Sequence, residues 1–195
     1  MKHIKEYIDP FNEDDWDEVE VEGAFLIWLK INYPYESKWK DITRINCGYQ
    51  ELTDLIGIDK LINLERLSCN YNQLTNLDLS KNIKLEYLSC DNNQLTELDV
   101  SNNIKLKTLY CYNNQLSELD ITNNIKLEEL YCSYNQLIEL DVTNNIKLKT
   151  LYCFNNQLTE LNVSNNINLI YLYCFNNKIT ELDVNNINLR NFRIF

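Results

Sequence analysis

The phrase that decides the fold is LKTLYCYNNQLSELDITNNIK at residues 106–126, and a close copy, LEELYCSYNQLIELDVTNNIK, follows at residues 127–147. One cysteine marks each copy, and the series runs at intervals of 21 residues through Cys69, Cys90, Cys111, Cys132, Cys153 and Cys174. A unit of this length with apolar residues at fixed places cannot cover its own apolar side, so successive copies must stack around one continuous core. The sequence therefore predicts a repeat solenoid.

Each unit is predicted to hold one strand and one extended, turn-rich return. Along the strand, Leu109 and Cys111 are expected to point into the core. Thr108, Tyr110 and Tyr112 alternate with them and are expected to point outward. The return repeats the strand's pattern of L-x-x-L-x-h-x-x-N, where h is aliphatic, and is too short for a typical helix. We expect a straight stack of about eight parallel rungs, with strand segments beginning at Ile42, Leu64, Leu85, Leu106, Leu127, Leu148, Leu169 and Leu189.

The full motif, L-x-x-L-x-C-x-x-N-x-L-x-x-L-D/N-h-x-x-N, is specific because every place in it recurs. It resembles the bacterial leucine-rich-repeat proteins, in particular those with short 21-residue repeats related to the internalins. The resemblance covers residues 42–195, which we predict to form the solenoid domain. It implies a leucine-rich-repeat fold in which the strand face is the usual recognition surface for a partner.

Residues 1–41 lie outside the repeat and are predicted to form a cap on its N-terminal end. Within them, Glu22 to Lys30 reads as a short amphipathic helix. Phe25, Trp28 and Leu29 have the i, i+3, i+4 spacing that places side chains on one helix face. We expect little helix elsewhere.

The charge of the chain argues against two classes of partner. The 195 residues carry a formal net charge of -11, whereas affinity for nucleic acid comes mainly from clustered lysine and arginine. Anionic membranes are disfavoured for the same reason. Neither an apolar stretch of signal-peptide length nor one of the ~20 residues that span a bilayer is present. We therefore expect a cytoplasmic protein, while secretion without a cleaved signal stays open.

The cysteines are predicted to be structural. All seven, Cys47 included, occupy one place in the repeat, where they would form an internal row of small apolar groups. A disulfide between neighbouring rungs is geometrically conceivable but would leave one thiol over. No C-x-x-C pair exists, and the only histidine is His3, so neither a metal site nor a Cys-His or Ser-His pairing is expected within the repeats. We predict no enzyme activity and no cofactor.

Two polar rows follow from the same period. The asparagine that closes each strand can bridge successive turns through its amide; the row is Asn72, Asn93, Asn114, Asn135, Asn156 and Asn177, with Gln50 in the first rung. The return arm carries outward acids at Glu97, Glu118, Glu139, Glu160 and Glu181 and at Asp99, Asp120, Asp141 and Asp183, with Asn162 in the fourth place. Their repulsion could be offset by the row of Lys84, Lys105, Lys126 and Lys147, or the aspartates could bind local backbone. Calcium is disfavoured because no loop combines alternating Asp with a Gly turn.

Aromatic residues dominate the outward strand positions from the fourth rung onward. In-register rings could merely stack and stabilise the sheet, or they could anchor a partner, as exposed tyrosine and phenylalanine often do. The predicted partner-binding residues are Tyr87, Tyr110, Tyr112, Tyr131, Tyr152, Phe154, Tyr171, Tyr173 and Phe175.

The leading hypothesis is a non-catalytic protein-protein interaction module. Glycan binding on the tyrosine row and a purely structural or assembly repeat are the alternatives. The last strand edge could also make a homodimer contact, which the charges of Arg190 and Arg193 would discourage.

Overall fold

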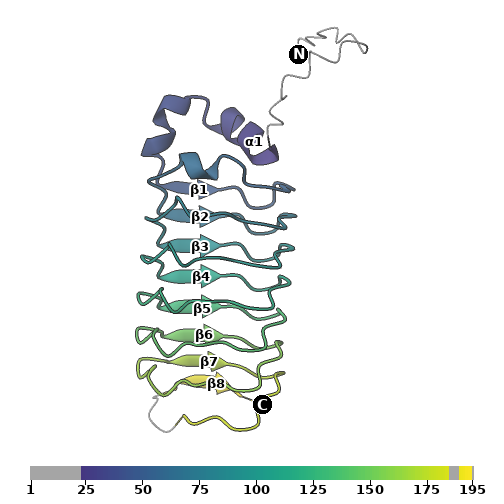
Figure 1. The fold of residues 1–195 in the computed structure, drawn as a ribbon, viewed down its shortest axis with the longest axis vertical. Coiled ribbons are helices and arrows are strands. Elements are labelled where there is room, and N and C mark those ends of the chain that lie inside the picture. Colours follow the sequence, from purple (N-terminus) through teal and green to yellow (C-terminus); the bar gives the residue numbers. More distant parts are fainter. Residues whose placement is uncertain (1–22, 185–188, 195) are drawn as a thin grey trace.

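A single parallel sheet runs the length of the molecule, which we describe from a computed structural model covering residues 23–184 and 189–194 (Figure 1). Within these residues the sheet has eight strands, and each pairs with the next along the chain. The strands are β1 (Arg44–Asn46), β2 (Arg66–Ser68), β3 (Tyr87–Ser89), β4 (Thr108–Tyr110), β5 (Glu129–Tyr131), β6 (Thr150–Tyr152), β7 (Tyr171–Tyr173) and β8 (Asn191–Arg193). The predicted solenoid of parallel rungs is confirmed.

The strands are shorter than predicted and begin two residues later in each rung. In the fourth rung the amide of Leu106 donates to the carbonyl of Asn103, 2.9 Å away, within the preceding turn. The amide of Lys107 is the first to reach the neighbouring rung, at the carbonyl of Glu86, 2.8 Å away. In the six segments from Leu64 to Leu169, the leucine that opens the segment therefore belongs to the turn in its hydrogen bonding, although its side chain lies in the core.

The alternation predicted along the strand is confirmed. Leu109 and Cys111 are fully buried, whereas Thr108, Tyr110 and Tyr112 are partly exposed. The register is one whole rung throughout, so equal places of the repeat lie side by side. The return arms are extended and turn-rich, and the rungs stack in a straight column (Figure 1).

The N-terminal end of the column is covered by helical segments. Helix α1 (Ala24–Asn32) lies two residues beyond the predicted Glu22 to Lys30 range, and it buries Phe25 and Leu29 completely. A 3-10 helix, η2 (Glu36–Asp41), follows and was not predicted. The division into a cap at 1–41 and a solenoid at 42–195 stays a prediction, and residues 1–22, with His3, lie outside the described residues.

The helical segment is joined to the first return arm at a specific point. The amide of Ala24, at the start of α1, donates to the Asp54 carboxylate over 3.0 Å. Nearby, Gly57 precedes the short 3-10 helix η3 (Ile58–Lys60) and has a φ of 98°. A Cβ on Gly57 would stand 3.0 Å from Leu26 Cδ1, so a side chain there would both strain the backbone and press on α1.

The C-terminal end of the described column is open. Phe192 in β8 lies in register with Leu172 of β7, as the predicted inward row requires. It nevertheless stays 54% exposed, because no described rung lies beyond β8 to cover it. Ile194 is partly buried against the core.

Candidate interaction face

Asparagine amides fix the turn that follows each strand. Asn114 is buried, and its Nδ2 donates to the carbonyls of Cys90 and Cys111, each 3.1 Å away. Its Oδ1 accepts the amide of Leu95 at 3.0 Å. Each amide thus joins two turns, as predicted. Gln50 departs from the pattern: it is exposed, and its Oε1 accepts the indole N–H of Trp28 at 3.1 Å, which connects the first rung to α1.

A second buried asparagine row lies at the other turn and was missed in the sequence. In a typical member, Asn124 Nδ2 donates to the carbonyls of Val100 and Asn103, each 3.0 Å away. Its Oδ1 is buried and has no hydrogen-bond partner within the described structure. The signal was the final N of the repeated L-x-x-L-x-h-x-x-N pattern; the row is Asn82, Asn103, Asn124, Asn145 and Asn166.

The residue just before each closing position adopts left-handed backbone, with φ between 52° and 57°. Asparagine tolerates this conformation better than other residues with side chains. Tyrosine nevertheless stands there in the first, second and fifth rungs. Tyr134, in the fifth, is 53% exposed, and its ring meets the ring of Phe154 edge-on at 5.2 Å. The row reads Tyr49, Tyr71, Asn92, Asn113, Tyr134, Asn155 and Asn176.

Five tyrosine rings form a continuous row of ring contacts on the outer strand face, which we call the tyrosine strip: Tyr87, Tyr110, Tyr131, Tyr152 and Tyr173. Successive ring centroids are 5.8, 4.5, 4.7 and 4.7 Å apart. A second short stack, Phe154 on Phe175 at 4.6 Å, joins the strip through Tyr152, whose centroid is 6.4 Å from that of Phe154. The structure thus brings together seven of the nine predicted residues.

The three inner tyrosines of the strip have raised pKa values, and an arginine lies near each end of the aromatic face. Burial raises the pKa of Tyr110, and the Glu129 carboxylate, which accepts its hydroxyl at 3.4 Å, raises it further. Burial likewise raises the pKa of Tyr131 and Tyr152. At the two ends, the guanidinium of Arg66 lies 4.2 Å from the ring centroid of Tyr87, and that of Arg193 lies 4.2 Å from that of Phe175. These contacts are cation-π interactions.

The other two predicted residues have different surroundings. Burial and a hydrogen bond to Asp91 raise the pKa of Tyr112 to about 12. Asp91 is only 2% exposed and also accepts the Ser89 hydroxyl at 2.6 Å and the Asn92 amide at 2.8 Å. Tyr112 therefore belongs to a polar cluster beside the strip. Tyr171 is 39% exposed at the first position of β7.

The aspartates of the return arm are engaged by their own turns, which was one of the two expectations for them. Asp120 Oδ1 accepts the amide of Thr122 at 2.9 Å and its hydroxyl at 2.7 Å. The hydroxyl bond and then the amide bond lower the pKa of Asp120. Asp78, Asp99 and Asp141 accept the corresponding amides in their turns.

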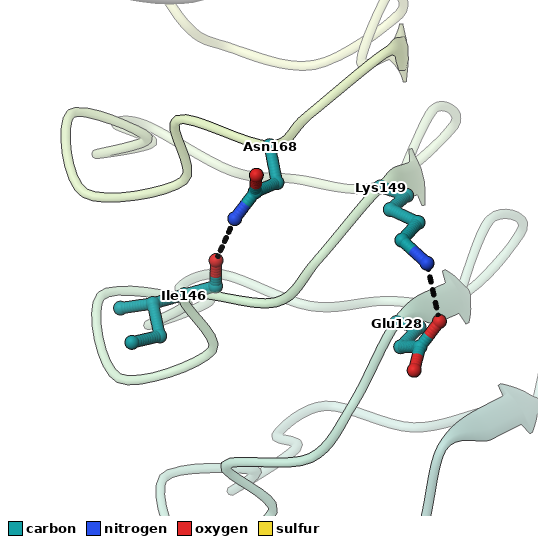
Figure 2. A network of polar contacts seen from close by, with 4 residues as sticks. All are labelled: Glu128, Ile146, Lys149 and Asn168. Atoms are coloured by element: carbon teal, nitrogen blue, oxygen red, sulfur yellow. Dashed lines mark hydrogen bonds and ion pairs between the residues drawn. The ribbon is translucent and has the colours of Figure 1, made fainter.

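Lysines pair with acids elsewhere, at the start of the strands. Lys107 Nζ lies 2.8 Å from Glu86 Oε2, and Lys149 Nζ lies 2.7 Å from Glu128 Oε2. Figure 2 shows the second pair, in which each partner comes from a neighbouring rung. Such exposed pairs contribute about 0–1 kcal/mol each, so they serve mainly to balance charge between rungs.

The seven cysteines are free and buried. Burial raises the pKa of Cys47 and of Cys132 to about 12, so these thiols are neutral and inaccessible at physiological pH. In the part of the chain that the structure describes, no three His, Cys, Asp or Glu side chains gather where they could hold a metal ion. Among the same residues, none of the helices has the length and apolar character to cross a membrane.

No protein-family model matches the chain. Internalin J of Listeria monocytogenes serotype 4b (strain F2365) is 42% identical over 47 residues, which are 24% of this chain and 5% of that protein. A solved structure of the functional domain of internalin J from L. monocytogenes, which includes a cysteine ladder, is 34% identical with a TM-score of 0.58. The match covers 80% of this chain and 45% of that one.

Two further structures are similar. A leucine-rich-repeat protein of Leptospira interrogans is 29% identical with a TM-score of 0.68, over 72% of this chain and 39% of that one. A plant peptide hormone receptor, solved in complex with RGF2, is 26% identical with a TM-score of 0.56, over 62% of this chain and 22% of that one. The chain spans less than half the length of internalin J and of the first solved structures that it matches.

Proposed function

We propose that this chain, a leucine-rich-repeat protein related to the internalins, is a non-catalytic interaction module that presents the tyrosine strip to a protein partner. The observation that carries the proposal is the unbroken series of ring contacts over five rungs on the outer face of the sheet. Tyrosine is enriched among residues that dominate binding energy, because it combines a large apolar ring with a polar tip.

Pre-ordering of the rings favours binding. Each inner ring of the strip touches a ring in the rung before and in the rung after it, so few side-chain rotations remain to be lost when a partner docks. The ordering of a mobile side chain at an interface costs about 0.5–1.5 kcal/mol. The guanidinium groups at the two ends of the strip add positive charge, which suits a partner with acidic groups at its rim.

The relatives support the general idea of a protein partner. In the plant receptor a leucine-rich-repeat fold is in complex with RGF2. Glycan binding is less well supported, because sugars stack best on flat aromatic platforms. Tyr152 is tilted by 59° from Tyr131 and by 52° from Tyr173, so the rings of the strip do not lie in one flat plane.

The test removes two rings from the middle of the strip. A Tyr131→Ala, Tyr152→Ala double variant should no longer capture the partner that wild-type chain retains from a lysate of the source organism, identified by mass spectrometry. The matched control is Tyr49→Ala, Tyr71→Ala, which removes another stacked pair, with centroids 4.4 Å apart, outside the strip. It should capture the partner as wild type does.

Thermal melting of the variants distinguishes a binding role of the rings from a role in stabilising the sheet alone. A cross-strand pair contributes only about 0.2–1 kcal/mol, so both double variants should melt within a few degrees of wild type. Capture that survives in the strip variant would contradict the proposal. Loss of capture together with the fold would favour the purely structural role, and a glycan array with specific hits that depend on Tyr131 and Tyr152 would favour glycan binding.

A further inference from the structure

Six isoleucines are exposed in one column, at the turn that leads into each strand. We call them the isoleucine ridge: Ile62, Ile83, Ile104, Ile125, Ile146 and Ile167, with exposed fractions between 51% and 63%. Hydrogen bonds from the backbone and side chains hold these turns; for example, Asn168 Nδ2 donates to the Ile146 carbonyl at 3.0 Å (Figure 2). The exposed isoleucine side chains are therefore not required to shape the turn. Contiguous apolar patches of several hundred Å² on a protein surface commonly mark a contact site.

Lysines border the ridge on its C-terminal side. In four successive rungs the isoleucine is followed directly by an exposed lysine, at Lys84, Lys105, Lys126 and Lys147. The ridge is thus an apolar line with a cationic border on a chain whose net charge is -11. The surface that best suits it is apolar in the middle and acidic at the side.

The return arms of the same molecule form such a surface. A groove of about 1130 Å³ runs over them; its floor is formed by the outer atoms of nearly buried leucines such as Leu119 and Leu140, and the acidic rows border it. The aspartates in these rows are engaged by their own turns. Across the described residues, no hydrogen bond or ion pair engages the carboxylates of Glu97, Glu118, Glu139 and Glu160.

We propose that the isoleucine ridge of one copy docks into this groove of a second copy. Both features repeat once per rung, so with the two columns side by side each isoleucine meets a leucine position and each lysine a glutamate position along several rungs. Pairing ridge with ridge would bring lysine rows together, and like charges in register repel. Ridge and groove are different surfaces of one chain, so the contact leaves a free ridge and a free groove at the ends and can continue to further copies.

The contact should be weak and sensitive to salt. Four to five rungs at ~4.8 Å give a seam of roughly 20–25 Å, which is at the small end of specific protein interfaces. In sedimentation velocity of the full chain at low ionic strength, the weight-average mass should rise above 23.3 kDa with increasing concentration. In about 0.5 M NaCl, where charges are screened beyond a few Å, the association constant should fall by about tenfold or more.

Two variants test the apolar part. An Ile104→Ser, Ile125→Ser, Ile146→Ser variant should remain a monomer across the same concentration range. The matched control, Ile27→Ser, Ile31→Ser, removes two exposed isoleucines of α1 that lie outside both the ridge and the groove, and it should associate as wild type does. Circular dichroism melts show whether each variant is folded, and the exposed positions make a loss of fold unexpected.

A charge exchange tests the pairing itself. A Lys105→Glu, Lys126→Glu, Lys147→Glu variant and a Glu118→Lys, Glu139→Lys, Glu160→Lys variant should each stay monomeric alone, and a mixture of the two should form mixed oligomers. A wild-type chain that stays monomeric at every concentration, or a mixture that does not associate, overturns the proposal. A third outcome would also overturn it: monomeric wild type co-sediments with phosphatidylserine vesicles and the isoleucine variant does not. The ridge would then be a membrane contact.

Discussion

The asparagine side chains of the two buried rows differ in how many of their hydrogen-bonding groups have partners. An amide can donate two hydrogen bonds and accept others at its oxygen. Asn114 uses both ends, since its Oδ1 accepts the Leu95 amide. Asn124 donates twice, but its buried oxygen has no hydrogen-bond partner among the residues described. Asparagine therefore contributes unequally to the free energy of folding at the two turns.

This difference predicts unequal losses on truncation. Asn114→Ala leaves the buried amide of Leu95 without a partner, which costs about 1–3 kcal/mol, whereas the carbonyls of Cys90 and Cys111 keep a second asparagine donor each. Asn124→Ala leaves no buried group without a partner, because the carbonyls of Val100 and Asn103 still accept backbone amides. Urea titrations should show both variants destabilised, with the free energy of unfolding of Asn114→Ala lower by a further ~1 kcal/mol. Equal losses would contradict the assignment of an unused oxygen on Asn124.

The buried thiols predict how stability depends on alkaline pH. An unfolded cysteine ionises near pH 9, whereas burial raises the pKa of folded Cys132 to about 12. Between these values the unfolded chain releases a proton that the folded chain keeps, so the free energy of unfolding falls as pH rises, by up to about 1.4 kcal/mol per pH unit for each such thiol. Below pH 9 both states are protonated, and this loss is absent.

Urea midpoints measured at several pH values above 9 check this expectation. Tyrosines with raised pKa values act in the same direction, so the thiol part is isolated by comparison with Cys132→Ala, whose stability should fall less steeply with pH. An unchanged slope in that variant would rule out the thiol as a contributor.

The strands are alike in length, but they differ in how far their residues are buried. The central strands bury their middle leucine and have a neighbour on each side, whereas all three residues of β8 are exposed. The amide of Cys174 donates to the Arg193 carbonyl at 2.9 Å, so β8 is paired on the side that faces β7. Few buried contacts and an open edge are the conditions for local opening.

Hydrogen exchange should therefore follow a gradient along the column. Peptides that contain residues 189–194 should exchange their amides much faster than peptides that contain β4 and β5, as measured by mass spectrometry after dilution into deuterated buffer. Equal protection at the two places would mean that the β8 edge is covered, as it would be in the homodimer predicted through this edge.

The whole molecule behaves as a one-dimensional stack, because each rung contacts mainly the rung before and the rung after it. Residues at the same place of the repeat therefore form rows along the column. The cysteine row is buried, and the isoleucine row is exposed. We therefore expect interaction surfaces on such a molecule to be elongated along the column. The tyrosine strip and the isoleucine ridge are the two that we propose.

Much of this was predictable from the period alone. The alternation of each strand, repeated in every copy, predicts Leu109 and Cys111 inside and Tyr110 outside, as the structure has them. The same pattern predicts a strand start two residues too early, because the Leu106 amide donates to the Asn103 carbonyl in a turn that no strand pattern reveals. The start of α1 also depends on a distant residue, Asp54, which accepts the amide of Ala24.

The sequence by itself determined the number of rungs, the inward and outward places and the closing asparagines, because a fixed period gives every copy the same neighbours. Only the tertiary structure decided how side chains interact at places of the repeat where neighbouring copies carry different residues. Tyr112 pairs with a buried aspartate while Tyr131 contacts a ring on each side, although both point outward from the sheet. The reason is physical: the environment of an outward side chain is set by the rungs above and below it, and those contacts exist only once the column has formed.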